Sequence, residues 1–350
     1  MKKSLVSIIG SVVLLFFATT AGIPYFSNLP VDWESSAESN PPHAQEHTLV
    51  VTSTADSGSG TLRQAILDAR SGDTITFDPV VFPPTSPVTI ALTSGLPDLN
   101  QGDLTIDASN AGVILDGGGI SSDWTAGLQI NSDGNTVQGL EIVNLFQGAG
   151  IVLSGGAQHN KIGGDRRIGS GPMGQGNIIR DGDTGVGIWD QGTSFNVVTG
   201  NLIGADDAHG NSGSGVWISD GASYNTVGPE NIIAYNGVHG VEIRDASSIG
   251  NTITSNSIHH NEGVGIYLFN GGNLMLTPPF LSKFDLNAGT IEGTACSYCL
   301  VEIFSDSGDQ GEFYEGQTRA DNLGFFAFNN GEAFSGIHLT ATNTDVEGNT

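Results

Sequence analysis

The stretch from residue 148 to residue 268 constrains the fold most, because it repeats one short pattern five times. Each copy is a Gly-rich turn followed by an apolar strand, at residues 148–153, 185–190, 213–218, 237–243 and 263–268. The second glycine of each copy is placed at positions 150, 187, 215, 240 and 265, so the regular copies are about 25 residues apart. A repeat of this length with short strands and no helical spacing predicts a β-solenoid.

In a solenoid, equivalent residues of successive coils stack at the spacing of parallel strands, roughly 4.8 Å. The pattern predicts an inner apolar row formed by Ile151, Ile188, Val216, Val241 and Ile266. Recurring asparagines predict two hydrogen-bonded ladders, one at positions 160, 196, 225 and 251 and one at 177, 201, 231 and 256. The alternative is a β-sandwich with turns at similar intervals, which would explain no repeat of fixed length.

The charge balance restricts the partners. The 350-residue chain has 37 acidic and 11 basic residues, a net charge of −26. A field of that sign repels nucleic acid and polyanionic sugars and attracts cations, so we expect no nucleic-acid partner. The 51 glycines occur in a chain that is 38% hydrophobic, so they indicate turns and not wholesale disorder.

The N-terminus predicts export. Lys2 and Lys3 precede an uncharged apolar run from residue 5 to 21, as in a secretory signal. Small residues at 19–21 offer a cleavage site, but the run is also about as long as a membrane-spanning helix. Residues 1–22 are therefore either a signal peptide or a membrane anchor, and only an uncleaved segment would contact a membrane. Residues 23–47, with prolines at 24, 30, 41 and 42, predict a disordered linker.

A strand at residues 49–56 and a short amphipathic helix follow. Thr61 can cap the helix, and one apolar face contains Leu62, Ala65, Ile66 and Ala69. We expect this helix to cover the open end of the first coil. The runs SGSGTLRQAI (57–66) and GDTITF (72–77) resemble the opening segment of bacterial surface proteins related to polymorphic outer-membrane adhesins. In that group the segment precedes a right-handed parallel β-helix.

Irregular coils are expected from residue 73 to 144, with strands near 74–77, 88–92, 104–106, 113–115, 128–130, 135–137 and 140–142. An insertion at 163–176 accounts for the 37-residue step from Gly150 to Gly187. Together the coils resemble the pectate-lyase-like superfamily of right-handed parallel β-helices, over about residues 49–272. The predicted fold is all-β, with a parallel β-helix from residue 48 to 277.

A second module is predicted from residue 278 to 350. Pro278 and Pro279 mark its start, and short alternating strands at sandwich-like spacing follow, near 290–293, 299–304, 316–318, 325–328 and 337–342. The run at 339–350 resembles the last strand of bacterial immunoglobulin-like modules, which usually continue further, so we expect a short or truncated module. Cys296 and Cys299 are expected to form a disulfide in a tight turn, since two cysteines alone make an incomplete metal site.

The most specific candidate site is an outward column. If the residue after each inner apolar residue points outward, the column consists of Val152, Trp189, Trp217, Glu242 and Tyr267. Aromatic side chains at this spacing could stack on sugar rings, so Trp189, Trp217, Glu242 and Tyr267 are candidate ligand-binding residues. Alternatively, another part of the chain covers this face.

Acidic clusters offer a second site. Asp181 and Asp183 lie in one coil and Asp206 and Asp207 in the next, and paired acids are what glycosidic cleavage requires. The sequence lacks the signatures of the lyases and polygalacturonases with this fold, and such corners are usually solvated or weak cation sites. Beyond a calcium ion at Asp206 and Asp207, we expect no cofactor.

Two functions of different class follow. The first is a non-catalytic exported protein, secreted or at the cell surface, that binds carbohydrate, cell wall or other extracellular partners. The alternative is a polysaccharide lyase or glycoside hydrolase that uses the Asp clusters.

Overall fold

The computed structural model describes residues 47–121 and 124–350, so the predicted signal or anchor segment (1–22) lies outside the described residues. The described chain starts with β1 (Thr48–Val51) and α1 (Leu62–Asp68). The Thr61 hydroxyl caps α1 by accepting a hydrogen bond from the backbone N–H of Gln64 at 3.2 Å. Leu62 and Ile66 are fully buried in the same core as the first strands, so the predicted amphipathic face is correct.

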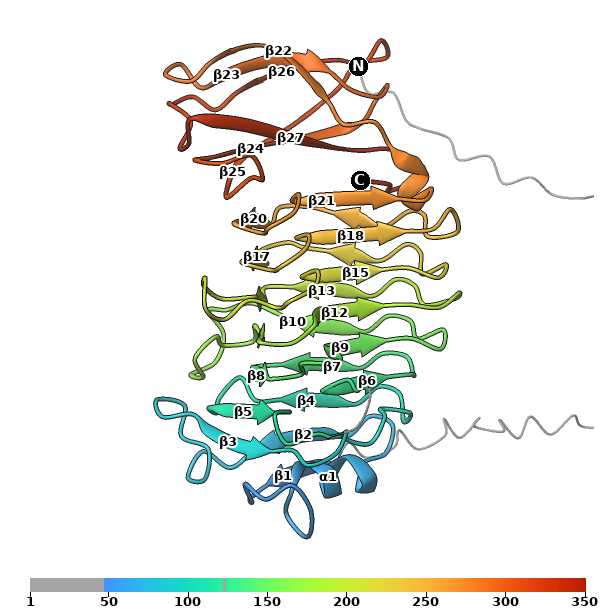
Figure 1. Ribbon diagram of the computed structural model, residues 1–350, viewed down its shortest axis with the longest axis vertical. Coiled ribbons are helices and arrows are strands. Elements are labelled where there is room, and N and C mark those ends of the chain that lie inside the picture. Colours follow the sequence, from blue (N-terminus) through green and yellow to red (C-terminus); the bar gives the residue numbers. More distant parts are fainter. Residues whose placement is uncertain (1–46, 122–123) are drawn as a thin grey trace, which may run out of the picture. The chain divides into compact units, whose positions relative to one another are not determined.

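Three parallel sheets follow one another around each coil (Figure 1). Sheet A comprises β1, β2 (Thr74–Phe77), β4 (Thr105–Asp107), β7 (Thr136–Gln138), β10 (Lys161–Gly163), β13 (Val197–Thr199), β16 (Thr226–Val227) and β19 (Thr252–Ile253). Sheet B comprises β3 (Val88–Ala91), β5 (Val113–Asp116), β8 (Leu140–Val143), β11 (Ile178–Arg180), β14 (Leu202–Ile203), β17 (Ile232–Ala234) and β20 (Ser257–His259). Sheet C comprises β6 (Leu128–Ile130), β9 (Ala149–Leu153), β12 (Thr184–Ile188), β15 (Val216–Ile218), β18 (Val241–Arg244) and β21 (Ile266–Phe269).

All neighbouring strands of these sheets run parallel, which confirms the solenoid and makes the sandwich alternative wrong for residues 148–268. The eight strands of sheet A correspond to about eight turns. The coils stack because a single coil cannot bury its own apolar face. In a stack, each coil covers the apolar face of its neighbours.

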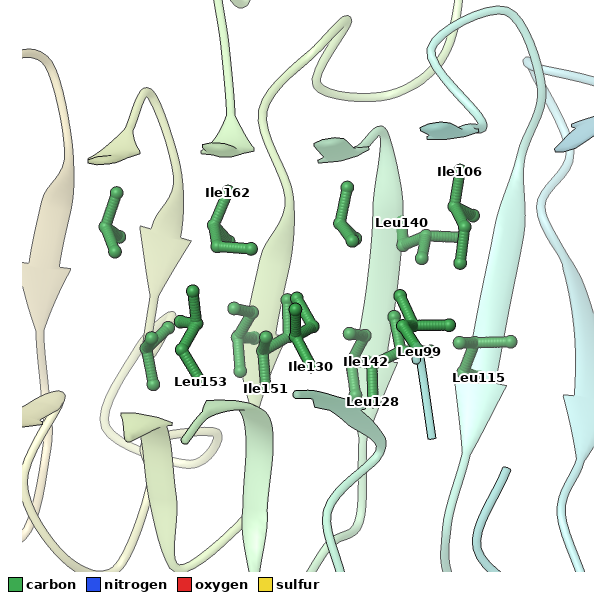
Figure 2. Packing of buried hydrophobic residues seen from close by; sticks show 14 of the residues in the cluster. Leu99, Ile106, Leu115, Leu128, Ile130, Leu140, Ile142, Ile151, Leu153 and Ile162 are labelled. Atoms are coloured by element: carbon green, nitrogen blue, oxygen red, sulfur yellow. The ribbon is translucent and has the colours of Figure 1, made fainter. Parts of the chain in front are cut away.

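The inner side chains fill one continuous core, in which isoleucine and leucine stack along the axis (Figure 2). The predicted inner row is wrong at one residue: Val186, not Ile188, pairs with Ile151 and Val216. Ile188 belongs to the next inner row, with Leu153 and Ile218. Both residues are fully buried, because a shift by two residues keeps a strand's inner and outer faces unchanged.

The glycine that opens each sheet C strand is required by close packing. A Cβ at Gly185 would lie 2.4 Å from Ile203 Cγ2, and one at Gly215 would lie 2.6 Å from Ile233 Cγ2. Any larger residue would therefore push an isoleucine of sheet B out of the core. The glycine aligned with Gly150 and Gly215 is thus Gly185, and the sequence-based choice of Gly187 is wrong.

Asparagine ladders stabilise the corners, as predicted. In the first ladder each Asn Nδ2 donates to the Oδ1 of the equivalent Asn in the next coil at 2.8–3.1 Å, through Asn135, Asn160, Asn196, Asn225 and Asn251. The second ladder runs in the same way through Asn177, Asn201, Asn231 and Asn256. A third ladder, absent from the prediction, joins Asn211, Asn236 and Asn261. These side chains are buried, so the bonds satisfy polar groups that would otherwise be costly.

After the last coil, a short 3₁₀ turn, η1 (Gly272–Met275), leads into two small antiparallel sheets. The first module sheet comprises β22 (Phe280–Asp285), β23 (Thr290–Thr294) and β26 (Phe325–Asn329). The second module sheet comprises β24 (Leu300–Asp306), β25 (Phe313–Arg319) and β27 (His338–Thr344). They share a core that includes Ile291, Val301, Ile303 and Phe326. Sequence patterns missed β22, whose residues are mostly exposed and carry no strict alternation.

Candidate functional site: the outer face of sheet C

The outer face of sheet C carries the predicted column, with one correction. The register places Val152, Gly187, Trp217, Glu242 and Tyr267 opposite one another on successive strands. Trp189 is therefore not in this row but two residues after Gly187, directly beyond the end of β12. Its ring folds back over the glycine, since a Cβ at Gly187 would lie 2.4–2.8 Å from three Trp189 ring atoms. The missing side chain at Gly187 makes room for the indole.

Three tryptophans make contact on this face. The rings of Trp189 and Trp217 meet edge to face, with centroids 5.7 Å apart, and Trp124 lies 5.3 Å from Trp189 on the other side. Trp189 also packs on a small apolar cluster that contains Ala149 and Val152. The Nε1 atoms of Trp189 and Trp217 are both buried and have no hydrogen-bond partner among the described residues. An unpaired buried donor costs free energy, so the described residues leave these two indoles without their full hydrogen bonding.

An ion pair between a buried carboxylate and a partly exposed arginine underlies the middle of the face. Glu242 is 3% exposed, and its carboxylate accepts hydrogen bonds from Ser214 Oγ at 2.8 Å and Arg244 Nε at 2.7 Å. The guanidinium carbon of Arg244 lies 4.9 Å from the Trp217 ring centroid and 5.7 Å from that of Phe269. Glu242 thus orients Arg244 over the aromatic rings and does not itself point to solvent.

Tyr267 continues the face in the last coil. Its ring stacks on His239 with centroids 4.2 Å apart and lies 5.9 Å from Phe269. His239 Nδ1 accepts a hydrogen bond from the Val264 N–H at 3.1 Å, so this nitrogen carries no proton. Burial lowers the pKa of His239, nearby Arg244 adds to the effect, and Glu242 opposes it. The histidine is therefore a neutral aromatic member of the face.

We call this surface the aromatic face and define it by Trp124, Trp189, Trp217, His239, Arg244, Tyr267 and Phe269. Trp124 is 49% exposed and Phe269 is 47% exposed, so rings at both ends are accessible to solvent. The recorded ring contacts of Trp189 and Trp217 are with each other, Trp124 and Arg244. These members of the face thus cover one another in part.

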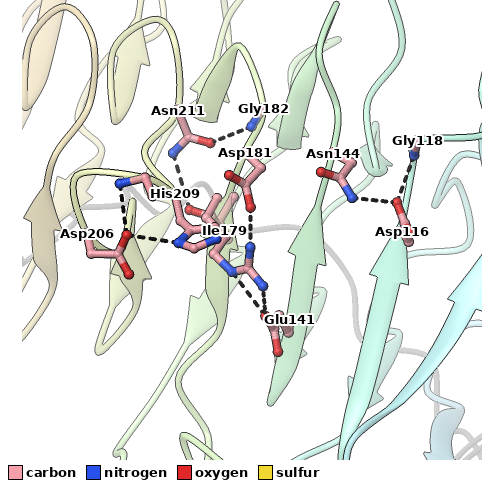
Figure 3. A network of polar contacts seen from close by, with 12 residues as sticks. Asp116, Gly118, Glu141, Asn144, Ile179, Asp181, Gly182, Asp206, His209 and Asn211 are labelled. Atoms are coloured by element: carbon pink, nitrogen blue, oxygen red, sulfur yellow. Dashed lines mark hydrogen bonds and ion pairs between the residues drawn. The ribbon is translucent and has the colours of Figure 1, made fainter.

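The acidic clusters lie elsewhere, around β11 and the loop after β14 (Figure 3). Arg180 binds Asp181 and also donates to Glu141 Oε1 at 2.6 Å, so it bridges two carboxylates from neighbouring coils. Asp183 Oδ1 accepts a hydrogen bond from Ser212 Oγ at 3.4 Å. Asp183 therefore contacts the next coil directly, whereas Asp181 binds Arg180, which makes the contact with the neighbouring coil.

Asp206 and Asp207 are exposed in the loop after β14. Asp206 Oδ1 accepts hydrogen bonds from the Ala208 N–H at 2.9 Å and from His209 Nδ1 at 2.8 Å. These bonds, the backbone bond first, lower the pKa of Asp206. Within residues 47–121 and 124–350, no group of three or more His, Cys, Asp or Glu side chains has a geometry that could hold a metal ion. The calcium ion expected at Asp206 and Asp207 stays a prediction.

Cys296 and Cys299 form a disulfide in the turn that leads into β24. Asn343 Nδ2 donates to Cys296 Sγ at 3.0 Å, which ties this turn to β27. The pair is a structural element of the module and lies in neither candidate site.

Sequence reasoning left several members out of the site. Arg244 and Phe269 each follow a column residue by two positions, and an alternating strand places such residues on the same face. This alternation along the strand could have identified Arg244 and Phe269 from the sequence. Trp124 lies in a loop before β6, and His239 precedes β18, so no strand pattern could have placed them.

Comparison with known families agrees with this architecture. A family model described as "Right handed beta helix region" matches residues 104–278, which is half of the chain. The chain belongs to this family of right-handed β-helix proteins. No curated protein matches the sequence significantly. In the described part of the chain, no helix is long and apolar enough to cross a bilayer.

Proposed function

We propose that the aromatic face binds carbohydrate, and that the protein is a non-catalytic binder of extracellular glycans or cell wall. The observation that carries this proposal is a run of contacting aromatic rings on one side of the solenoid, in which the Trp124 ring is about half exposed. Sugar rings present apolar C–H faces that stack on aromatic side chains, and their hydroxyls accept hydrogen bonds.

The ligand class follows from charge. The chain carries a net charge of −26, and on the aromatic face the charge of Arg244 is already compensated by Glu242. A polyanionic glycan or a nucleic acid would therefore be repelled at low ionic strength. A neutral glycan built of pyranose rings is the ligand class that this face fits.

The proposal assigns a location to each part of the chain. Residues 1–22 direct export, as a signal peptide or an anchor, and residues 23–47 act as a linker, which places the protein outside the cell or at its surface. Residues 48–277 form the β-helix, whose opening segment resembles those of surface adhesins. Residues 278–350 form an immunoglobulin-like module. The export signal rests on the basic start and the apolar run at residues 5–21, whereas the adhesin likeness and the immunoglobulin-like class rest on sequence resemblances.

The test is binding of the purified protein to neutral polysaccharides, measured by affinity electrophoresis and titration calorimetry. The double variant Trp189→Ala/Trp217→Ala should weaken binding at least about tenfold, since an aromatic contact contributes about 0.5–1.5 kcal/mol beyond its buried area. Trp124→Ala, which truncates a half-exposed ring, should weaken binding with little risk to folding.

A matched control exists at another corner. Phe195 and Tyr224 stack at 5.8 Å on a different side of the coil and are about half exposed, so Phe195→Ala/Tyr224→Ala removes a comparable aromatic pair. Binding should survive in this control. Equal loss in both double variants, or full binding by a folded Trp189→Ala/Trp217→Ala protein, would remove the proposal. Release of oligosaccharides in the same assay, with or without a chelator, would instead favour the lyase or hydrolase alternative and direct attention to Asp181, Asp183, Asp206 and Asp207.

A further inference from the structure

The last coil of the solenoid ends in three sheet edges. β19, β20 and β21 are the terminal strands of sheets A, B and C. An open edge leaves backbone donors and acceptors without partners and invites pairing with another chain. What contacts these edges therefore determines whether the β-helix is closed at this end.

Gln310, between β24 and β25, continues the third asparagine ladder. Its Oε1 accepts from the Asn261 N–H at 3.0 Å and from Asn261 Nδ2 at 3.1 Å. Asn261 Oδ1 accepts the same pair of bonds from Asn236, at 3.1 and 2.8 Å. Gln310 Nε2 also donates to the carbonyls of Asn261 and Gly263, at 2.7 and 2.8 Å. A glutamine of the module thus reproduces the bonds that the next coil would make.

The first ladder and the edge of sheet A are continued by two other segments. Asn273 in η1 accepts from the Asn251 N–H at 3.1 Å, as Asn251 does from Asn225. Along β19, the Gly250 N–H donates to Asn349 Oδ1 at 2.6 Å and the Ile253 N–H donates to Thr350 Oγ1 at 3.0 Å. Residues 348–350 therefore lie where a ninth strand of sheet A would lie.

The remaining corner is occupied by a carboxylate. Glu302 in β24 is 1% exposed, and it accepts hydrogen bonds from Thr254 Oγ1 at 2.8 Å, from Ser255 Oγ at 2.9 Å and from the Ser255 N–H at 3.2 Å. On the adjacent edge of sheet B, the Ile258 N–H donates to the Gly311 carbonyl at 3.0 Å. A charged residue buried at this depth needs such donors, and the last coil supplies three.

We infer that the C-terminal module is the cap of the β-helix, an interaction surface built to fit the end of the last coil. Its contacts with sheets A and B replace, corner by corner, the bonds of a missing coil. Sheet C differs, because β21 borders a cavity of about 620 Å³ lined by residues that include Ile266, Leu268, Thr340 and Thr342. The cap contacts two edges and leaves the third, next to the aromatic face, without a paired strand among the described residues.

The test compares two double variants of the full chain by hydrogen–deuterium exchange. Glu302→Ala/Gln310→Ala removes the two corner contacts. Glu332→Ala/Gln317→Ala is the matched control, because both side chains are exposed and make no hydrogen bond recorded among the described residues. In the first variant, exchange over residues 251–262 should accelerate about tenfold or more, since several buried groups lose partners. Exchange in β7, β10, β23 and β26 should not change.

A second expected result is self-association. Loss of the two corner contacts should loosen the module from the edge of sheet B and let that edge pair with another copy. The first variant should therefore form larger species in sedimentation experiments while the control stays unchanged, and unchanged sedimentation of the first variant would count against the inference. Unchanged exchange over residues 251–262 in the first variant, or equal acceleration in the control, would overturn the inference. Faster exchange in β23 and β26 as well would mean that the double substitution unfolds the module. The single variant Gln310→Met then tests the cap, because it keeps the length of the side chain and leaves Glu302 in place. Faster exchange near Asn261 in that variant supports the cap, and its absence overturns it.

Discussion

Asn225 illustrates how a single residue joins three coils. Its Oδ1 accepts hydrogen bonds from the N–H and the Nδ2 of Asn196, and its Nδ2 donates to Asn251 Oδ1 at 3.1 Å and to the Thr193 carbonyl at 3.1 Å. The side chain is fully buried. Asparagine suits this position because its amide is both donor and acceptor and carries no charge, so a row of identical residues can bond without repulsion.

Replacing Asn225 with alanine should lower the free energy of unfolding by about 3 kcal/mol, because several buried groups lose their partners at once. Denaturant unfolding measures this change. Asn322→Ala, at an exposed position in the module, should stay within about 0.5 kcal/mol of the parent. Equal effects of the two substitutions would mean that the ladder contributes little to stability.

Two histidines make stability depend on pH. Burial is the main cause that lowers the pKa of His239 and of His259 below the ordinary value of 6.5. The unfolded chain then binds protons that the folded chain does not, so the free energy of unfolding falls as the pH drops below about 6.5 and levels off once the folded histidines are protonated. Urea midpoints between pH 8 and pH 5.5 measure this slope.

The double variant His239→Gln/His259→Gln should flatten that slope. His47→Gln is the control, because this side chain is exposed and forms no hydrogen bond or ion pair with the residues that the structure describes. A slope that persists in the double variant would assign the pH dependence to other groups.

At the level of strands, the alternation of inner and outer residues was predictable, but the exact alignment of β12 was not. The run from Gly185 to Ile188 alternates glycine with apolar residues, so alignments that differ by two residues give the same inner face. Two contacts distinguish these alignments: Gly185 lies close to Ile203, and the ring of Trp189 lies over Gly187. The local sequence pattern specifies neither contact. For the same reason the site prediction included Trp217, Glu242 and Tyr267 in one row but misplaced Trp189.

The contacts of the module with the last coil were beyond prediction. Gln310 and Glu302 are 49 and 47 residues from their partners Asn261 and Ser255, and neither lies in a repeat. The third ladder, in contrast, was detectable, because Asn211, Asn236 and Asn261 each lie shortly before the glycine that opens a copy.

A matched pair of glycine variants tests the alignment of β12. Gly185→Ala places a Cβ 2.4 Å from both Ile203 Cγ2 and the Gly215 carbonyl oxygen, so it should destabilise the fold by about 1–3 kcal/mol. Gly187→Ala instead meets the Trp189 ring, so it should displace the indole and change tryptophan fluorescence. Urea unfolding and emission spectra report the two effects. The reverse pattern would favour the alignment with Gly187 in the glycine row.

At the scale of the whole molecule, each coil pairs its strands only with those of its neighbours, while charge acts across all coils. Side-chain ladders and core rows therefore supply local stability, and the net charge of −26 adds a repulsion that no single contact offsets. The electrostatic field of the chain also acts on a ligand, because an approaching polymer experiences the charges of many coils.

Salt should therefore separate neutral from acidic glycans. Retention by a neutral polysaccharide depends on ring stacking, so it should change by less than about twofold between about 0.05 and 0.5 M NaCl. Any binding to a polyuronate should be weakest at low salt, where the acidic chain repels it, and should rise as salt screens the charges. Affinity electrophoresis of the parent protein in both matrices measures this, with Trp189→Ala/Trp217→Ala as the background. Tight polyuronate binding that weakens with salt would mean that Arg244 or another local cation outweighs the net charge, and the ligand class proposed for the aromatic face would be wrong.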